Sequence, residues 1–168
     1  MLANKSSFGG VFKAECYDKD GNFKWSEEFP NLVVNGGLAF INTQVFQGSN
    51  YTATWYMGVI DGGATYAATD TMSSHAGWTE NVDYLQAARP TLTFNTTTTA
   101  NPAVIASIAA TYTMNAAATV GGAFLTTDST KGGTNGTLLS AGNFTVGNRG
   151  LVSGDTLNVT YTFSATAA

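Results

Sequence analysis

Apolar and polar residues alternate with a period of two over several short stretches of this chain. In residues 11–17, Phe12, Ala14 and Cys16 fall on one face and more polar side chains fall on the other. Such alternation is typical of a β-strand that buries one face. The sequence D-K-D-G-N at 18–22 has the composition of a tight turn, and a second strand-like stretch follows it. Together these residues predict a β-hairpin.

The longest alternation lies in the second half of the chain and predicts one continuous strand over residues 104–114. Six apolar residues at every second position would share its buried face: Val104, Ala106, Ile108, Ala110, Tyr112 and Met114. The last strand, at 156–164, is expected to point four residues inward: Leu157, Val159, Tyr161 and Phe163. The stretch 54–60 is apolar on both faces and is therefore expected to be a central strand. Shorter strands are predicted at 78–85, 92–94 and 119–125, and one strand or a pair of strands at 137–146.

One segment has a helical period instead. Leu38, Ile41 and Val45 are spaced so that they share one face of a helix, and Asn35 is a candidate for its N-terminal cap. The pattern predicts a helix of about three turns at most.

These elements together predict an all-β fold, an antiparallel β-sandwich with one short helix. A jelly-roll-like or irregular sandwich is favoured, because the Cys-Trp-Cys spacing of immunoglobulin domains is absent, although strand patterns do not distinguish the connectivities. Residues 1–9 have no periodicity and are expected to form a flexible N-terminal arm. Residues 10–168 are expected to form a single β-sandwich domain.

Composition narrows the classes of partner. The chain has 168 residues, and only 11% of them are charged, against about 25% in typical domains. The net charge of -4 argues against nucleic-acid binding, which needs clustered Lys and Arg. No run of apolar residues approaches the ~20 that span a bilayer, and the first residues lack the apolar stretch of a signal peptide. We therefore expect a soluble protein that binds neither nucleic acid nor membrane.

The residue types needed for catalysis are scarce. The chain has one histidine, His75, and one cysteine, Cys16, which excludes a zinc set and an internal disulfide. Glu80 and Asp83 are three residues apart, so they would lie on opposite faces of a strand rather than act as a pair. The acids at 18–22 resemble the start of an EF-hand loop, but strands flank them and a hairpin turn explains them. We expect no enzyme, no catalytic or metal-binding residues and no cofactor.

The long loop at 64–77 is the best candidate for a binding surface, because long irregular connections in compact domains often carry function. Met72 and His75 in this loop, with Trp78 directly after it, would form an apolar tip on a candidate contact segment at 64–78. Leu2 and Phe8, in the arm, are further candidate contacts. The alternative is that Trp78 belongs to the core and the loop only covers one end of the sandwich.

A series of short motifs, mostly turns and strand ends, extends over nearly the whole chain. They are C-Y-D-K-D-G-N (16–22), N-L-V-V-N-G-G-L (31–38), T-W-Y-M-G (54–58), D-T-M-S-S-H-A-G-W-T-E (70–80), A-R-P (88–90), G-G-A-F-L-T (121–126), S-T-K-G-G (129–133) and S-G-D-T-L-N-V-T-Y (153–161). In this order and spacing they resemble a family of small virion structural proteins of tailed bacteriophages, of the head decoration or cement type.

The resemblance implies a protein that works by contact alone. It would be made in the bacterial host cytoplasm and would bind the outer surface of the capsid as a homo-oligomer, bracing the shell of major capsid protein. Many copies on one particle gain avidity from individually weak contacts. Two other functions stay open: a phage tail or fibre component, and a carbohydrate-binding adhesin module, which would need exposed aromatic side chains on one face.

Overall fold

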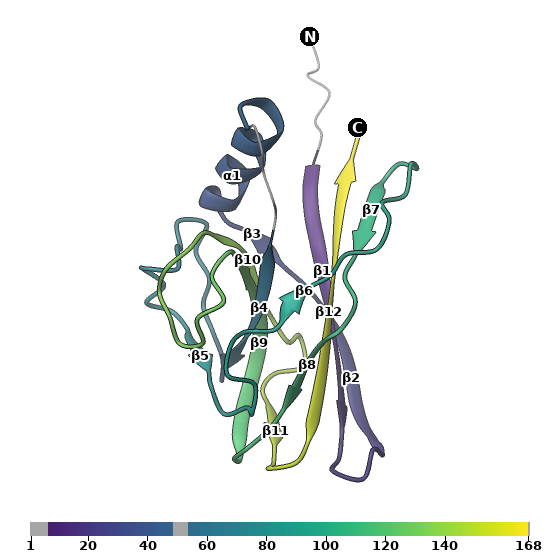
Figure 1. The fold of residues 1–168 in the computed structure, drawn as a ribbon, viewed down its shortest axis with the longest axis vertical. Coiled ribbons are helices and arrows are strands. Elements are labelled where there is room, and N and C mark those ends of the chain that lie inside the picture. Colours follow the sequence, from purple (N-terminus) through teal and green to yellow (C-terminus); the bar gives the residue numbers. More distant parts are fainter. Residues whose placement is uncertain (1–6, 49–53, 168) are drawn as a thin grey trace.

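Two antiparallel sheets pack face to face in this protein, whose computed structural model describes residues 7–48 and 54–167 (Figure 1). In the first sheet, β1 (Ser7–Tyr17) lies between β2 (Phe23–Pro30) and the last strand, β12 (Thr156–Thr166). The far side of β12 pairs with two short strands, β7 (Ala103–Ala106) and β8 (Ala110–Thr113). The first and last strands thus form the middle of one sheet.

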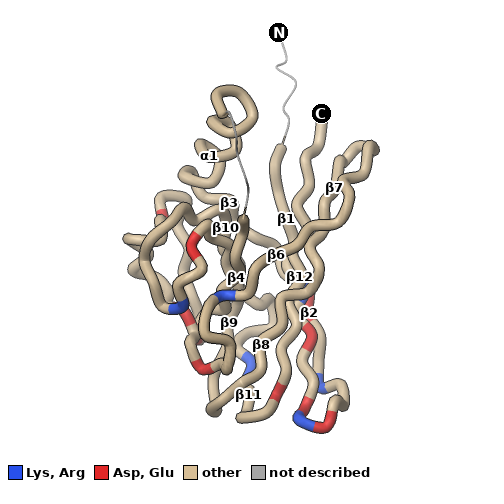
Figure 2. Tube along the Cα trace, in the orientation of Figure 1, with Lys and Arg blue, Asp and Glu red and all other residues tan. Residues whose placement is uncertain are grey.

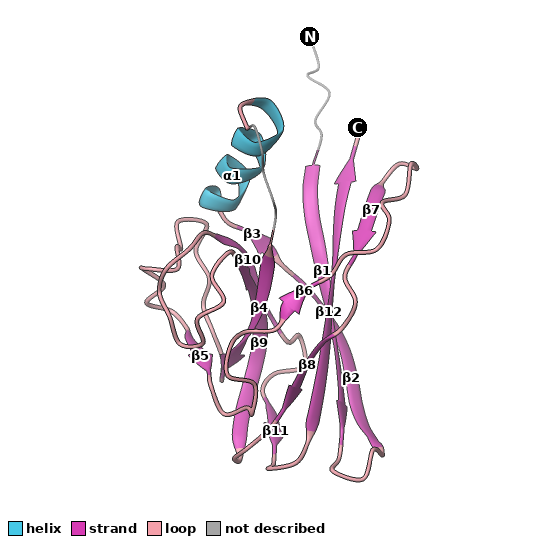
Figure 3. Ribbon diagram, viewed as in Figure 1, coloured by secondary structure: helices cyan, strands magenta, loops and turns pink. Residues whose placement is uncertain are grey.

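The second sheet is built around β4 (Trp55–Asp61) and β9 (Ala118–Thr126), which pair with each other. Beyond β9 come β10 (Leu138–Asn143), the short β3 (Leu32–Val33) and β11 (Arg149–Leu151). Beyond β4 come β5 (Thr79–Asn81) and β6 (Thr91–Leu92). A single helix among the described residues, α1 (Asn35–Phe46), lies beside β10 (Figure 3). The predicted antiparallel β-sandwich with one short helix is confirmed.

The main core lies between the two sheets, and alternation along the strands decides which residues enter it. Phe12, Ala14 and Cys16 of β1 are fully buried, as the period of two predicts. Leu157 and Val159 of β12 join them, together with Tyr112 and Met57 from the other strands. The hairpin between β1 and β2 is also confirmed, and its turn is closed by the Asp18 carboxylate, which accepts hydrogen bonds from the backbone N–H groups of residues 20 and 22.

A second, smaller apolar cluster covers the outer face of the second sheet. Its members are Val34, Ile60, Met72, Trp78, Phe124, Leu138 and Ala141. Neighbouring residues in β4 and β9 point to opposite faces, so Val59 enters the main core while Ile60 enters this cluster. The prediction that 54–60 forms a central strand with two apolar faces is therefore confirmed, and the loop after β4 supplies the cover for its outer face.

The continuous strand predicted over 104–114 is wrong: a β-bulge divides it into β7 and β8. Ala106 pairs with Thr162, whereas Ala110 pairs with Val159. Residues 106 and 110 are four positions apart, whereas their partners in β12, residues 162 and 159, are three positions apart. The segment that joins β7 to β8 therefore has one extra residue relative to β12.

The extra residue reverses which positions face inward. Before it, Ser107 is buried and its hydroxyl accepts a hydrogen bond from a backbone N–H of β12. After it, Tyr112 and Met114 are buried as predicted. Ile108, predicted to be inside, is 57% exposed. The alternation of Val104, Ala106 and Ile108 therefore follows the solvent side of the sheet.

The helix forms where the spacing predicts it, but it has neither the predicted cap nor a fully buried face. Residue 34 occupies the N-cap position, and no side chain caps the helix. Ile41 packs against the main core, whereas Val45 is 66% exposed. Gly37 is the helix residue that is fully buried, and a Cβ there would collide with the backbone of Leu139 in β10. A glycine at 37 is what permits the helix to approach the sheet this closely.

Three further expectations change at the edges of elements. Residues 7–9, predicted to belong to a flexible arm, are the start of β1 and pair with residues 164–166 of β12. The strand predicted at 78–85 is reduced to β5, at 79–81. The loop at 64–77, for which the sequence also allows one helical turn near 70–74, instead has an isolated bridge between Thr71 and Ser74.

Candidate contact site

Charged side chains are absent from one end of the described molecule. Figure 2 shows them gathered towards the opposite half, while α1, β7 and the upper parts of β1 and β12 have none. The sequence explains this, because residues 31–60, 90–127 and 156–168 contain no Asp, Glu, Lys or Arg. We call the end formed by α1, β7, the start of β1 and the end of β12 the open end.

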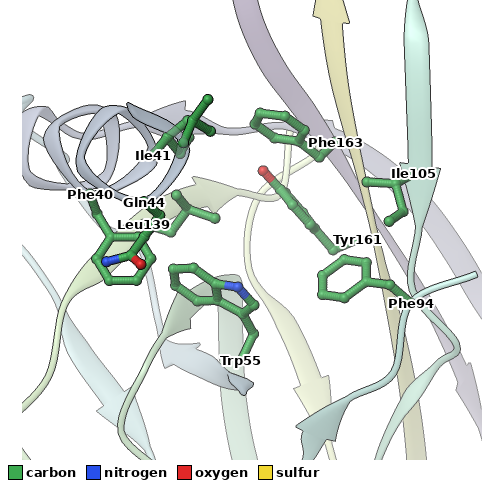
Figure 4. A pocket seen from close by; sticks show the side chains of 10 residues that line it. Phe40, Ile41, Gln44, Trp55, Phe94, Ile105, Leu139, Tyr161 and Phe163 are labelled. Atoms are coloured by element: carbon green, nitrogen blue, oxygen red, sulfur yellow. The ribbon is translucent and has the colours of Figure 1, made fainter. Parts of the chain in front are cut away.

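An apolar cleft of about 410 Å³ lies at the open end, between α1 and the first sheet (Figure 4). Its walls come from five elements and one loop: Phe40, Ile41, Gln44 and Val45 of α1, Trp55 of β4, Leu139 of β10, Ile105 of β7, Tyr161 and Phe163 of β12, and Phe94. Ile41, Trp55, Phe94 and Phe163 also pack against the main core. The cleft is thus a continuation of the core that no described segment covers.

The topology creates this cleft. β1 and β12 stay paired up to Ser7 and Thr166, so the first sheet continues as a wall at this end. In the second sheet β4 begins at Trp55, and α1 stands beside β10 in place of further strands (Figure 1). The two layers therefore separate at the open end, and aromatic side chains line the space between them.

Few polar groups reach the cleft, and none of them is charged. The Tyr161 hydroxyl accepts a hydrogen bond from Asn31 Nδ2 at 2.9 Å. Burial raises the pKa of Tyr161 to about 12, so this hydroxyl stays neutral at physiological pH. Trp55 Nε1 faces Tyr161 and Phe94 across the cleft (Figure 4). Neither this N–H nor the Gln44 amide forms a hydrogen bond with another described residue.

The rim of the cleft carries exposed apolar side chains. Val45 of α1, which also lines the cleft, is 66% exposed. Phe8, one of the predicted contact residues, is 43% exposed and stacks on Phe163 with ring centroids 5.8 Å apart. Phe8 therefore belongs to the open end. The predicted contact Leu2 lies outside the described residues.

The apolar tip predicted for the 64–77 loop is not present. Met72 and Trp78 are only 1% and 4% exposed, because both pack into the cluster on the outer face of the second sheet. The indole of Trp78 contacts Phe124, and its N–H donates to Asp70. The alternative considered from the sequence is correct in that Trp78 belongs to the core, but the loop covers the outer face of the second sheet rather than one end of the sandwich.

His75 is held in place by the same cluster. Its ring stacks on Trp78 with centroids 3.9 Å apart, and Nδ1 donates to the Trp78 carbonyl oxygen at 2.9 Å. A carbonyl only accepts, so this bond places the hydrogen on Nδ1. Asp70 bonds to Trp78 rather than to His75. Among the described residues, therefore, no carboxylate orients the imidazole as a triad requires.

Sequence reasoning missed a buried ionic cluster centred on Arg89. Its guanidinium donates to both Glu80 oxygens, at 2.9 and 2.7 Å, and to the carbonyl oxygens of Asp128 and Gly133, at 2.9 and 2.6 Å. The Arg89 and Glu80 side chains are 1% and 7% exposed. The cluster joins β5 to the loop at 127–137. The only local signal for it is an arginine before a proline in a stretch with little other charge.

The three tryptophans lie in three separate environments. Trp55 lines the cleft, Trp78 is in the outer cluster, and Trp25 of β2 packs edge-on against Phe144. They do not form the shared flat platform that a tryptophan-based sugar site needs.

Within residues 7–48 and 54–167, no three His, Cys, Asp or Glu side chains are grouped closely enough to hold a metal ion. Among the described residues, the helix has 12 residues, and no helix is long and apolar enough to cross a membrane.

Searches against protein-family models, curated proteins and solved structures find no match to this chain. Its own geometry therefore supplies the structural argument for function.

Proposed function

We propose that this protein is a non-enzymatic structural protein of a bacteriophage virion, of the capsid decoration or cement type. It binds the outer surface of the shell of major capsid protein, forms a homo-oligomer there and stabilises the shell. The sequence motifs support the family, and one structural observation supports action by contact: an apolar cleft opens at an end whose described residues carry no charge.

The physical argument concerns the cost of leaving such a surface in water. Contiguous apolar surface on a folded protein commonly marks a site of contact with another protein. Here the exposed Val45 lines the aromatic cleft, and Phe8, stacked on Phe163 of the lining, extends the same surface across to β1. Covering this end would remove apolar surface from water without burying a described charged group, so no penalty for desolvating a described charge opposes binding.

The test is co-sedimentation with undecorated shells of the same virus. Saturable binding at hundreds of copies per particle, with a shell that withstands heating better when decorated, is the expected result. Val45→Glu places a charge in the exposed part of the cleft lining and should abolish saturation. Val152→Glu is the matched control, because Val152 is also exposed (56%) but lies between β11 and β12 at the opposite end.

The copy number distinguishes this function from a tail or fibre component. A few copies per particle, or recovery with purified tails rather than shells, would assign the protein to the tail. Absence of binding to either, together with specific retention on a glycan array, would favour the adhesin module.

A further inference from the structure

We infer that the cleft at the open end takes up a large apolar side chain from an extended, uncharged segment of the shell protein. This inference rests on the proposed function and specifies which part of the open end recognises the shell and what chemistry it selects.

The lining selects against charge. All ten residues around the cleft are uncharged, and the one titratable group among them, Tyr161, keeps its proton at physiological pH. A Lys or Glu side chain entering this space would lose its hydration and find no oppositely charged partner among the lining residues. An aromatic or aliphatic side chain meets only favourable contacts with Trp55, Phe94 and Phe163.

The shape favours a narrow occupant. A volume of about 410 Å³ lies at the lower end of the range for ligand pockets, roughly 300–1,000 Å³. α1 stands on one side of the cleft, and the ends of β12 and β7 stand on the other (Figures 1 and 4). A single chain with one or two inserted side chains fits between these walls more readily than the broad face of a folded domain.

Two polar groups are placed to recognise a peptide backbone. The Trp55 indole N–H and the Gln44 amide line an otherwise apolar cleft and have no hydrogen-bonding partner among the described residues. An extended chain presents carbonyl oxygens that need donors when they leave water. A few convergent polar groups in an apolar pocket are the usual means of fixing the orientation of a ligand.

The experiment compares two isoleucines on the same segment of chain. Ile105→Trp fills the cleft from β7, whereas Ile108→Trp adds the same bulk to a position that is 57% exposed beyond the bulge. Binding curves to undecorated shells are measured by co-sedimentation, and thermal unfolding checks that each variant is folded. We expect Ile105→Trp to weaken apparent affinity ~10-fold or more and Ile108→Trp to change it less than about 2-fold.

A second variant removes the donor without filling the cleft. Trp55→Phe removes the indole N–H and retains an aromatic ring, and it should weaken binding by about 2- to 10-fold. This readout does not depend on overpacking, so it supports the inference even if Ile105→Trp is unstable.

Negative results would overturn the proposed function and the inference about the cleft in different ways. If wild-type protein does not bind shells, the proposed function is wrong and the inference fails with it. If wild-type protein binds but Ile105→Trp and Trp55→Phe bind equally well, only the inference is overturned. If analytical ultracentrifugation shows a dimer that Ile105→Trp dissociates while shell binding is unchanged, a second copy of this chain occupies the cleft, which also overturns it.

Discussion

Replacing Arg89 by methionine should strongly destabilise the fold, although Arg89 lies far from the open end. The guanidinium is 1% exposed, satisfies both oxygens of a nearly buried Glu80 carboxylate and lies over the Phe124 ring at 5.2 Å. Arg89→Met leaves that carboxylate in the protein without its counter-charge, and the carbonyl oxygens of Asp128 and Gly133 lose a donor. Removing one partner of a buried ion pair costs about 3–5 kcal/mol.

In a protein of this size, 1 kcal/mol corresponds to roughly 2–4 °C in the midpoint of thermal unfolding. Arg89→Met should therefore lower the midpoint by about 6–20 °C in scanning calorimetry, with a matching loss in urea titrations. The control is Lys19→Met, which removes a cation from an exposed pair with Asp20, where the side chains are 70% and 62% exposed. That change should lie within the error of the measurement.

A double variant separates the charge from the packing. Arg89→Met combined with Glu80→Leu removes both ions, so its loss of stability should be clearly smaller than the sum of the two single losses. A loss below about 1 kcal/mol for Arg89→Met, or strict additivity in the double variant, would refute the view that this pair joins β5 to the 127–137 loop.

Three further predictions follow from buried groups. Burial of Glu27 acts to raise the pKa of its carboxyl, but hydrogen bonds from the 145–149 segment outweigh this and lower the pKa below its usual 4.5. The stabilisation from the ionised Glu27 should therefore be fully present above pH ~4.5 and should be lost as the pH falls through the lower pKa of the folded state. In urea titrations, the difference in the free energy of unfolding between wild type and Glu27→Gln should shrink on acidification. Burial raises the pKa of Cys16 to about 11, so its thiol should react with a disulfide reagent at pH ~8 only when urea unfolds the protein, and stoichiometric labelling of native protein would contradict this. Ile108→Ala should change the free energy of unfolding by less than ~0.5 kcal/mol, whereas Met114→Ala, at a position 1% exposed, should cost about 2–5 kcal/mol; equal losses would mean that the bulge is not formed.

Local sequence patterns predicted the buried residues correctly wherever one face of a strand packs against a single core. The alternation of Phe12, Ala14 and Cys16, and that of Leu157, Val159 and Tyr161, predicted the buried faces of the two central strands, because side chains on successive strand residues point to opposite sides. The helical spacing that follows Asn35 likewise predicted the place of α1 in the chain, although not its cap.

Tertiary structure decided the features that depend on pairing between distant segments. The one-residue bulge before β8 exists only in the register with β12, so the period through Ile108 gave no sign of it. Met72 and Trp78 were placed on an exposed loop because nothing local shows that this loop folds back over Ile60 and Phe124. The cleft arises because β1 and β12 continue where the second sheet gives way to α1, which brings Trp55, Phe94 and Phe163 together from distant parts of the sequence. The sequence determined which residues are apolar and where charge is absent; the packing of the two sheets decided which of those residues remain uncovered at one end.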